Sequence, residues 1–85
     1  MDTYSLRIED RATRELRSLP KHDAARVVRR IHALAEDPRP QGCMRLSGAE
    51  GYRIRQGDWR VIYQVDDAKH EVRILKIGHR REVYR

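Results

Sequence analysis

Three arginines stand close together in the second half of the chain, at positions where they could hold a phosphate group. Arg53 and Arg55 alternate on one side of the Gln56-Gly57 pair, and Arg60 follows on the other side. Arginine carries a permanent positive charge on a planar fork that matches the oxygens of a phosphate. The pattern therefore predicts a cationic site for a phosphodiester, provided that these side chains share one face of the fold.

The C-terminal segment Gly78-His79-Arg80-Arg81-Glu82-Val83-Tyr84 adds groups with other chemistry. Histidine titrates near neutral pH, so His79 is a candidate to accept a proton, with Glu82 as a weaker one. Arginine cannot accept a proton at this pH, because its pKa lies above about 12. Tyr84 could stack on a nucleobase. The plainer alternatives are a tail histidine without a chemical role and a tyrosine that anchors the last strand.

The composition favours a polyanionic partner. The chain has 85 residues, which fits a single domain over 1–85. It carries 19 Lys and Arg against 13 Asp and Glu, a net charge of +6, and 16 of these cations are arginine. Excess positive charge on a small domain is typical of proteins that bind nucleic acid.

The sequence gives no sign of secretion, of a membrane span or of a metal centre. The first residues lead directly into an alternating segment, and no stretch approaches the ~18 apolar residues of a membrane span. Cys43 is the single cysteine, so we expect no internal disulfide and interpret it as a small packing residue. We therefore expect a cytoplasmic protein with no membrane contact, no cofactor and no metal.

The N-terminal half predicts one strand and two helices. Apolar residues alternate through 4–8, which is typical of a strand with one buried face. Asp10 is a suitable N-cap for the helix that follows, and Pro20 ends that helix. A second helix, with apolar residues at i, i+3, i+4 and i+7, starts near Asp23 and stops at the prolines of 37–40. The short link between the helices predicts an antiparallel hairpin.

From residue 42 onward the pattern changes to strands. A short extended piece and three longer strands are separated by turns, and the expected extended segments are 44–46, 52–55, 58–65 and 72–77. The resulting order, β-α-α-β-β-β, predicts an α+β domain. In it an antiparallel sheet carries the N-terminal helical hairpin on one face.

The turn at Gln56-Gly57 decides which side chains share a face of this sheet. With these two residues as the turn, Arg53 lies opposite Arg60 and Arg55 lies opposite Asp58. One face then collects residues expected under the helices: Tyr52, Ile54, Trp59, Val61, Tyr63, Val65, Val72 and Ile74. The other, called the arginine face below, collects Arg53, Arg55, Asp58, Arg60, Ile62, Gln64, Arg73, Leu75 and Ile77.

Two features of the arginine face indicate a binding partner. Like charges directly opposed across a strand pair destabilise it, and a bound phosphate would offset that cost for Arg53 and Arg60. The alternative is that both arginines are solvated and that polar neighbours relieve their repulsion. The apolar residues of this face would be exposed unless a partner or the C-terminal tail covers them.

Two motifs resemble the RelE/ParE toxins of type II toxin–antitoxin systems. The segment 51–65, with Gly51-Tyr52-Arg53-Ile54-Arg55 before the turn and Trp59-Arg60-Val61-Ile62-Tyr63 after it, is similar to their central hairpin. The ending 77–84 is similar to their C-terminal motif. The opening strand and helices fit as well, so the resemblance covers essentially the whole chain.

The resemblance implies a curved sheet and a cognate antitoxin that wraps the toxin and masks its basic groove. RelE-type members cut mRNA in the ribosomal A site, with the ribose 2′-hydroxyl as nucleophile and without a metal. ParE-type members poison DNA gyrase. The chain is more similar to the RelE type, so we expect an endoribonuclease that acts on mRNA at the ribosome and inhibits translation. We expect it to meet operator DNA only through the antitoxin.

The resemblance also implies roles for individual residues. Arg53 and Arg55 occupy the places of two basic residues that are often lysine in relatives, and Arg60 that of a phosphate-binding arginine. Arg80 matches an arginine that protonates or stabilises the leaving 5′-oxygen. Tyr84 matches a tyrosine that stacks on or orients the base. Because arginine stands at both lysine positions, the proton acceptor stays open between a tail residue, water and the ribosome.

Two other functions stay open at this point. The chain could be a ParE-like gyrase poison that uses the helical hairpin and tail as contacts. It could also be a catalytically degenerate toxin that acts only in antitoxin complex and operon repression. The outer face of the second helix carries Arg26, Arg29 and Arg30, which could bind ribosomal RNA but which a solvated helix face explains as well.

Overall fold

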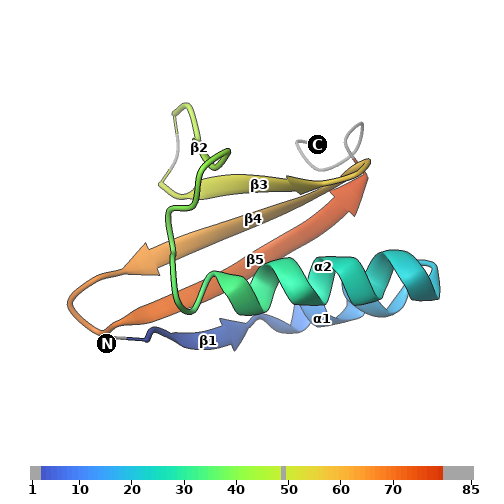
Figure 1. The fold of residues 1–85 in the computed structure, drawn as a ribbon, viewed down its shortest axis with the longest axis horizontal. Helices are drawn as coiled ribbons and strands as arrows, with labels where there is room; N and C mark the ends of the chain where they lie inside the picture. The colour runs from blue at the N-terminus through green and yellow to red at the C-terminus, as the bar shows by residue number, and fades with distance from the viewer. Residues whose placement is uncertain (1–2, 49, 80–85) are drawn as a thin grey trace.

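Two helices and five strands form a two-layer fold in the computed structural model, which describes residues 3–48 and 50–79. The elements are β1 (Ser5–Ile8), α1 (Asp10–Arg17), α2 (Lys21–Ala33), β2 (Met44–Arg45), β3 (Tyr52–Gln56), β4 (Trp59–Asp66) and β5 (Glu71–His79). The strands form a single sheet in the order β1-β5-β4-β3-β2. Figure 1 shows α1 and α2 as an antiparallel hairpin along one side of it.

Both helices begin earlier than the sequence pattern predicted. Glu9 is the N-cap of α1, so Asp10 is its first helical residue and not the cap. Either place suits an aspartate, because the positive end of the helix dipole favours acidic side chains throughout the first turn. Pro20 is the N-cap of α2, which starts at Lys21 and not near Asp23. The proline ring holds φ at −54°, and so permits a sharp change of direction between the helices.

The α+β class and the element order are confirmed. Strands β2 to β5 pair in antiparallel fashion, as the turns between them predicted. The structure adds one parallel pair at the edge, where β1 lies beside β5 with Ser5 next to Glu71 and Ile8 next to Ile74. Parallel neighbours need a long connection, and the helices and the other strands provide it.

The register predicted for β3 and β4 is wrong, because the turn between them lies one residue later in the chain than predicted. The turn consists of Gly57 and Asp58, so Arg55 lies opposite Arg60, and Arg53 lies opposite Ile62. Gly57 has a φ of +61°. A two-residue turn with glycine at its first central position matches the twist of a hairpin, which explains why the turn shifts by one residue. The partners change, but each strand keeps the same side chains on the same face.

The pairing of β4 with β5 contains a β-bulge that the sequence did not reveal. Near the turn the predicted pairs are confirmed, including Tyr63 opposite Ile74. Farther from the turn, β5 contains one extra residue, Leu75, so that Ile77 pairs with Val61. An extra residue reverses the alternation of everything that follows. Ile77 is therefore a core residue, 1% exposed, and its predicted place on the arginine face was wrong.

The core lies between the helices and one face of the sheet. Its buried members are Ala12, Leu19, Val27, Ile31, Leu34, Ile54, Val61, Tyr63, Val72, Ile74 and Ile77. The hydroxyl of Tyr63 donates a hydrogen bond of 2.7 Å to the carbonyl oxygen of Pro38. Burial raises the pKa of Tyr63. Trp59 and Cys43 pack against this cluster, which confirms both as packing residues.

Candidate functional site

Arg53, Arg55 and Arg60 still share one face of the sheet in the observed register. The side chains of this face form rows that cross the strands. One row consists of Arg55, Arg60 and Gly78, and the next consists of Met44, Arg53, Ile62 and Lys76. Neighbouring strands lie about 4.8 Å apart, and successive residues of one face lie roughly 7 Å apart along a strand. The three predicted arginines therefore gather in one patch.

Arg60 is the most unusual side chain of the patch. Its Nε and Nη1 atoms are buried, and none of the described residues accepts a hydrogen bond from them. A buried donor without a partner costs about 1–3 kcal/mol, and more when it is charged. Gly78, the neighbour of Arg60 on β5, has no side chain that could accept a hydrogen bond from these donors. An anion bound at Arg60 would satisfy both donors.

Arg53 and Arg55 lie on either side of this position and differ in exposure. Arg53 is half-buried, and its Nη2 donates to the sulfur of Met44 at 2.6 Å. Arg55 is exposed and lies directly opposite Arg60. The like-charge pair across the hairpin is therefore Arg55 with Arg60, where the sequence predicted Arg53 with Arg60. The repulsive arrangement persists, and an anionic ligand would relieve it.

His79 lies on the opposite side of the sheet from Arg60. It pairs with Trp59, and the two rings meet edge to face with centroids 5.7 Å apart. Trp59 packs against the core, so His79 shares the helix side, where a cavity includes Glu15 of α1. A carboxylate oxygen of Glu15 accepts a hydrogen bond of 2.9 Å from the backbone nitrogen of Ile77 and holds this end of β5 against α1. The structure therefore does not bring His79 to the arginine patch.

The remaining predicted site residues belong to the C-terminal tail. Arg80, Glu82 and Tyr84 lie outside the described residues. Their proposed roles therefore rest on the sequence.

Lys76 is the residue of the patch that sequence reasoning missed. The bulge at Leu75 places it opposite Ile62, on the arginine face and half-buried. Simple alternation from Arg73 put Leu75 opposite Ile62 and assigned both Leu75 and Ile77 to this face. The cost of burying a lysine on the core face was the one signal that could have revealed the bulge, since lysine is almost never fully buried.

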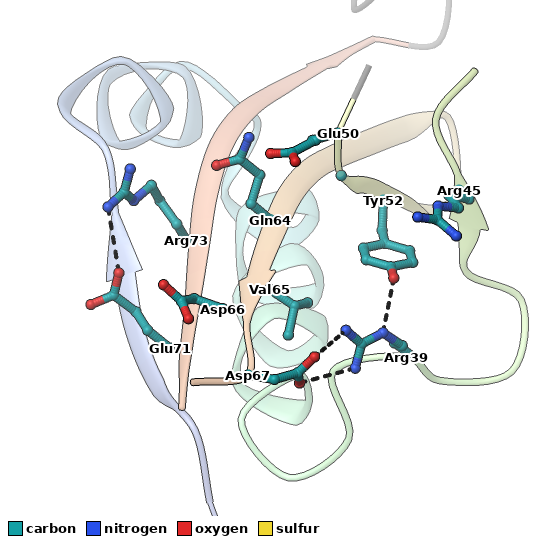
Figure 2. Close-up of a pocket in the computed structure, with 11 residues that line it drawn as sticks. Arg39, Arg45, Glu50, Tyr52, Gln64, Val65, Asp66, Asp67, Glu71 and Arg73 are labelled. Atoms are coloured by element: carbon teal, nitrogen blue, oxygen red, sulfur yellow. Dashed lines mark hydrogen bonds and ion pairs between the residues drawn. The ribbon is translucent and has the colours of Figure 1, made fainter. Parts of the chain in front are cut away.

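A second concave region lies at the other end of the sheet, with a volume of about 450 Å³. Figure 2 shows Arg39 reaching from the loop before β2 toward Tyr52 and Asp67. Arg39 donates to Tyr52 Oη at 2.9 Å and to Asp67 Oδ2 at 2.8 Å. The cationic and acidic residues that line this region are Arg39, Arg45, Arg73, Glu50, Asp66, Asp67 and Glu71. Its mixed charge does not favour a polyanion.

The contacts of Arg39 are structural. The hydroxyl of Tyr4 also donates to Asp67, at 2.6 Å, so one carboxylate joins three distant segments. The hydrogen bond from Arg39, followed by that from Tyr4, holds the pKa of Asp67 below its ordinary value of 3.8. The same carboxylate raises the pKa of Tyr4. The network ties the chain before β1 and the loop before β2 to the turn between β4 and β5.

Metal ligands do not gather in the part of the chain that the structure describes. Within residues 3–48 and 50–79 there is no group of three or more His, Cys, Asp or Glu side chains that could hold a metal ion. Neither of the described helices has the length and apolar character needed to cross a membrane.

Fold and site together define a class: a small α+β protein with a helical hairpin behind its sheet and an arginine-lined face in front. A family model described as the ParE toxin of the type II toxin–antitoxin system, parDE, matches residues 6–84. The chain therefore belongs to the RelE/ParE toxin superfamily of type II toxin–antitoxin systems.

Two curated toxins and one crystal structure agree with this assignment. Toxin RelE of Mycobacterium tuberculosis is 36% identical over 84 residues, which cover 96% of this chain and 87% of that protein. Toxin RelG of the same organism is 33% identical over 84 residues, with 96% and 97% covered. A toxin–antitoxin complex, RelBE2 of M. tuberculosis, contains a chain that superposes with a TM-score of 0.84 at 30% identity and 93% coverage of both chains.

Proposed function

We propose that this chain is a ribosome-dependent endoribonuclease that cuts mRNA and thereby arrests translation in the cytoplasm. The observation that carries the proposal is the buried guanidinium of Arg60, whose Nε and Nη1 have no acceptor among the described residues. It lies in a patch with Arg53 and Arg55, on the face of the sheet away from the helices. A phosphodiester of the message supplies the missing acceptors.

The arginine patch suits cleavage through the ribose. In that reaction the 2′-oxygen attacks the adjacent phosphorus, the bond to the 5′-oxygen breaks, and a 2′,3′-cyclic phosphate remains. Negative charge accumulates on the phosphorane oxygens, where Arg53, Arg55 and Arg60 stabilise it. Arg80 protonates or stabilises the leaving oxygen, and Tyr84 stacks on the neighbouring base. The chain's own cations serve this chemistry without a metal.

A cognate antitoxin is the second partner. The RelE-type chain of RelBE2 is found in a toxin–antitoxin complex. On this chain the arginine face also carries the apolar side chain of Ile62, which lies between Arg53 and Lys76. An antitoxin segment that bears acidic and apolar residues fits such a face and keeps the message out. Contact with operator DNA comes through the antitoxin.

Poisoning of DNA gyrase is the alternative function. The matching family model is described as a ParE toxin, which favours this reading. In that case the cationic side of α2, with Arg26, Arg29 and Arg30, and the tail are the contact surfaces, and the chain is not an enzyme.

Induction of the toxin in a bacterial host without its antitoxin separates these activities. An mRNA endonuclease stops incorporation of labelled amino acids within minutes and leaves the chromosome intact. A gyrase poison produces chromosome breaks and a DNA damage response while bulk translation continues. If growth is unaffected although folded protein accumulates, the chain is a degenerate toxin and both proposals fail.

A further inference from the structure

Cleavage by the 2′-hydroxyl requires a group that removes its proton. General bases contribute about 10²–10⁴-fold to such reactions. Arg53, Arg55 and Arg60 cannot serve, because arginine stays protonated in proteins. His79 lies with Trp59 on the helix side of the sheet. The patch thus needs an acceptor from another residue of the arginine face.

Lys76 lies on β5 at the edge of the arginine patch, where it also borders the cavity beside Arg11 and Glu15 of α1. It pairs with Ile62 on β4, and Ile62 pairs with Arg53 on β3, so the three form one row across the sheet. Two strand spacings of about 4.8 Å separate the backbones of Lys76 and Arg53. Arg60 stands in the next row on the strand between them. A phosphodiester bound above Ile62 and Arg60 is therefore flanked by Arg53 on one side and by Lys76 on the other.

The row of Arg53, Ile62 and Lys76 is partly shielded from solvent. Ile62, the floor between the two cations, is only 8% exposed, and Lys76 is half-buried. Lysine is the cationic side chain that proteins also use as a base, whereas arginine remains a fixed charge. Of the three lysines in the sequence, Lys21 begins α2 and Lys69 lies in the turn before β5.

Other acceptors on this face are less suitably placed. Asp58 lies in the β3–β4 turn, beyond the last pair of the ladder. Glu71 is at the opposite end of β5, with Arg73 Nη2 at 3.6 Å from one of its carboxylate oxygens. Both are farther from the row of Arg53 and Ile62 than Lys76 is.

We infer that the Nζ amine of Lys76 accepts the proton of the attacking 2′-hydroxyl, while Arg60 holds the phosphate. The inference rests on the proposed mRNA endonuclease activity. The neutral amine takes the proton as the bond from the 2′-oxygen to phosphorus forms. The bond from phosphorus to the 5′-oxygen breaks, and that oxygen leaves with the electron pair and receives a proton from water. The ammonium of Lys76 then returns its proton to solvent.

Single-turnover cleavage of mRNA on programmed ribosomes, measured across pH, tests this role. Lys76→Arg keeps the charge and removes the ability to accept a proton, so we expect its rate to fall by about 10²–10⁴-fold. Below its plateau the wild-type rate should rise about tenfold per pH unit, and the Lys76→Arg rate should lose this rise. Lys69→Arg is the matched control and should behave as wild type. Urea unfolding of each variant verifies that it is folded.

Chemical rescue provides a second readout. Lys76→Cys in a Cys43→Ser background should be inactive, and aminoethylation of the new thiol should restore cleavage by rebuilding a lysine-like amine.

The possible failures are distinguishable. If Lys76→Arg cleaves at the wild-type rate with the wild-type pH profile, Lys76 supplies at most charge, and the inference is overturned while the endonuclease stands. If Lys76→Ala cleaves more slowly than wild type but Lys76→Arg does not, Lys76 again supplies only charge and the inference is overturned. If the wild-type protein makes no cut in translated message, the proposed function and the role of Lys76 fall together.

Discussion

Arg60 carries polar atoms that the fold buries without giving them hydrogen-bond partners. Its Nε and Nη1 lack an acceptor among the described residues, while Arg55 adds a like charge directly across the hairpin. Both features destabilise the free protein. Arg73, two rows away on the same face, shows the ordinary alternative, because it lies 3.4 Å from a carboxylate oxygen of Glu9. The contrast supports the proposal that Arg60 binds a ligand.

Replacement of Arg60 by methionine should leave stability unchanged or raise it. Methionine fills similar volume and removes a desolvated charge, so we expect the free energy of unfolding in urea to increase by as much as about 1 kcal/mol. Arg73→Met is the control and should lose at most about 1 kcal/mol, because it breaks exposed ion pairs. A loss above that value for Arg60→Met would mean that the guanidinium supports the fold.

At the scale of elements, the sequence predicted which strands exist and which faces they bury, but not how they align. The period-2 pattern fixes the face of each residue in β3 and β4 and is unaffected when the turn moves from Gln56-Gly57 to Gly57-Asp58. Turn geometry decided that shift, because glycine was needed at the first central position. The bulge at Leu75 left no clear trace in the sequence, since Leu75 and Ile77 fit either face. Lys76 was missed for this reason.

Gly51 should be the glycine least tolerant of substitution among those before β3. It has a φ of +123°, and an added Cβ would lie 2.7 Å from the backbone oxygen of Tyr63. Gly48 also has positive φ, at +74°, but an added Cβ meets no atom within 4 Å. We expect Gly51→Ala to lose about 1–3 kcal/mol more unfolding free energy than Gly48→Ala, because strand β4 would have to move. Equal losses in urea titrations would contradict this reading of the β3–β4 contact.

Asp67→Asn should remove a pH-dependent part of the stability. The pKa of Asp67 is lowered in the folded state, chiefly by Arg39, from an ordinary value of 3.8. Its contribution is therefore fully present above that value and is lost as the pH falls through the lower folded pKa. The difference in unfolding free energy between wild type and Asp67→Asn should be constant near neutral pH and should shrink below about pH 4. A difference that does not change with pH would exclude the carboxylate as the cause.

At the scale of the whole molecule, the helices and the two faces of the sheet have different roles. The helical hairpin covers one face of the sheet, and the other face carries Arg53, Arg55 and Arg60. This division followed from the element order and from the alternating pattern, which predicted the fold class, whereas the class of protein was predicted from the resemblance of two motifs to the RelE/ParE toxins. The strand β1 was predicted, but its parallel pairing with β5 was not, because pairing between the two ends of the chain leaves no local signal.

Mapping of 5′ ends on a message translated in a reconstituted system is the most direct test of the central claim. We expect wild-type protein to produce cuts within the codon in the ribosomal A site, and only while ribosomes occupy the message. Arg60→Met, shown to be folded, should reduce the rate by about 10²–10³-fold, as expected for the loss of one group that stabilises the developing charge. An uncut message with wild-type protein, or equal cutting by Arg60→Met, would contradict the assignment of this arginine face as the site of mRNA cleavage.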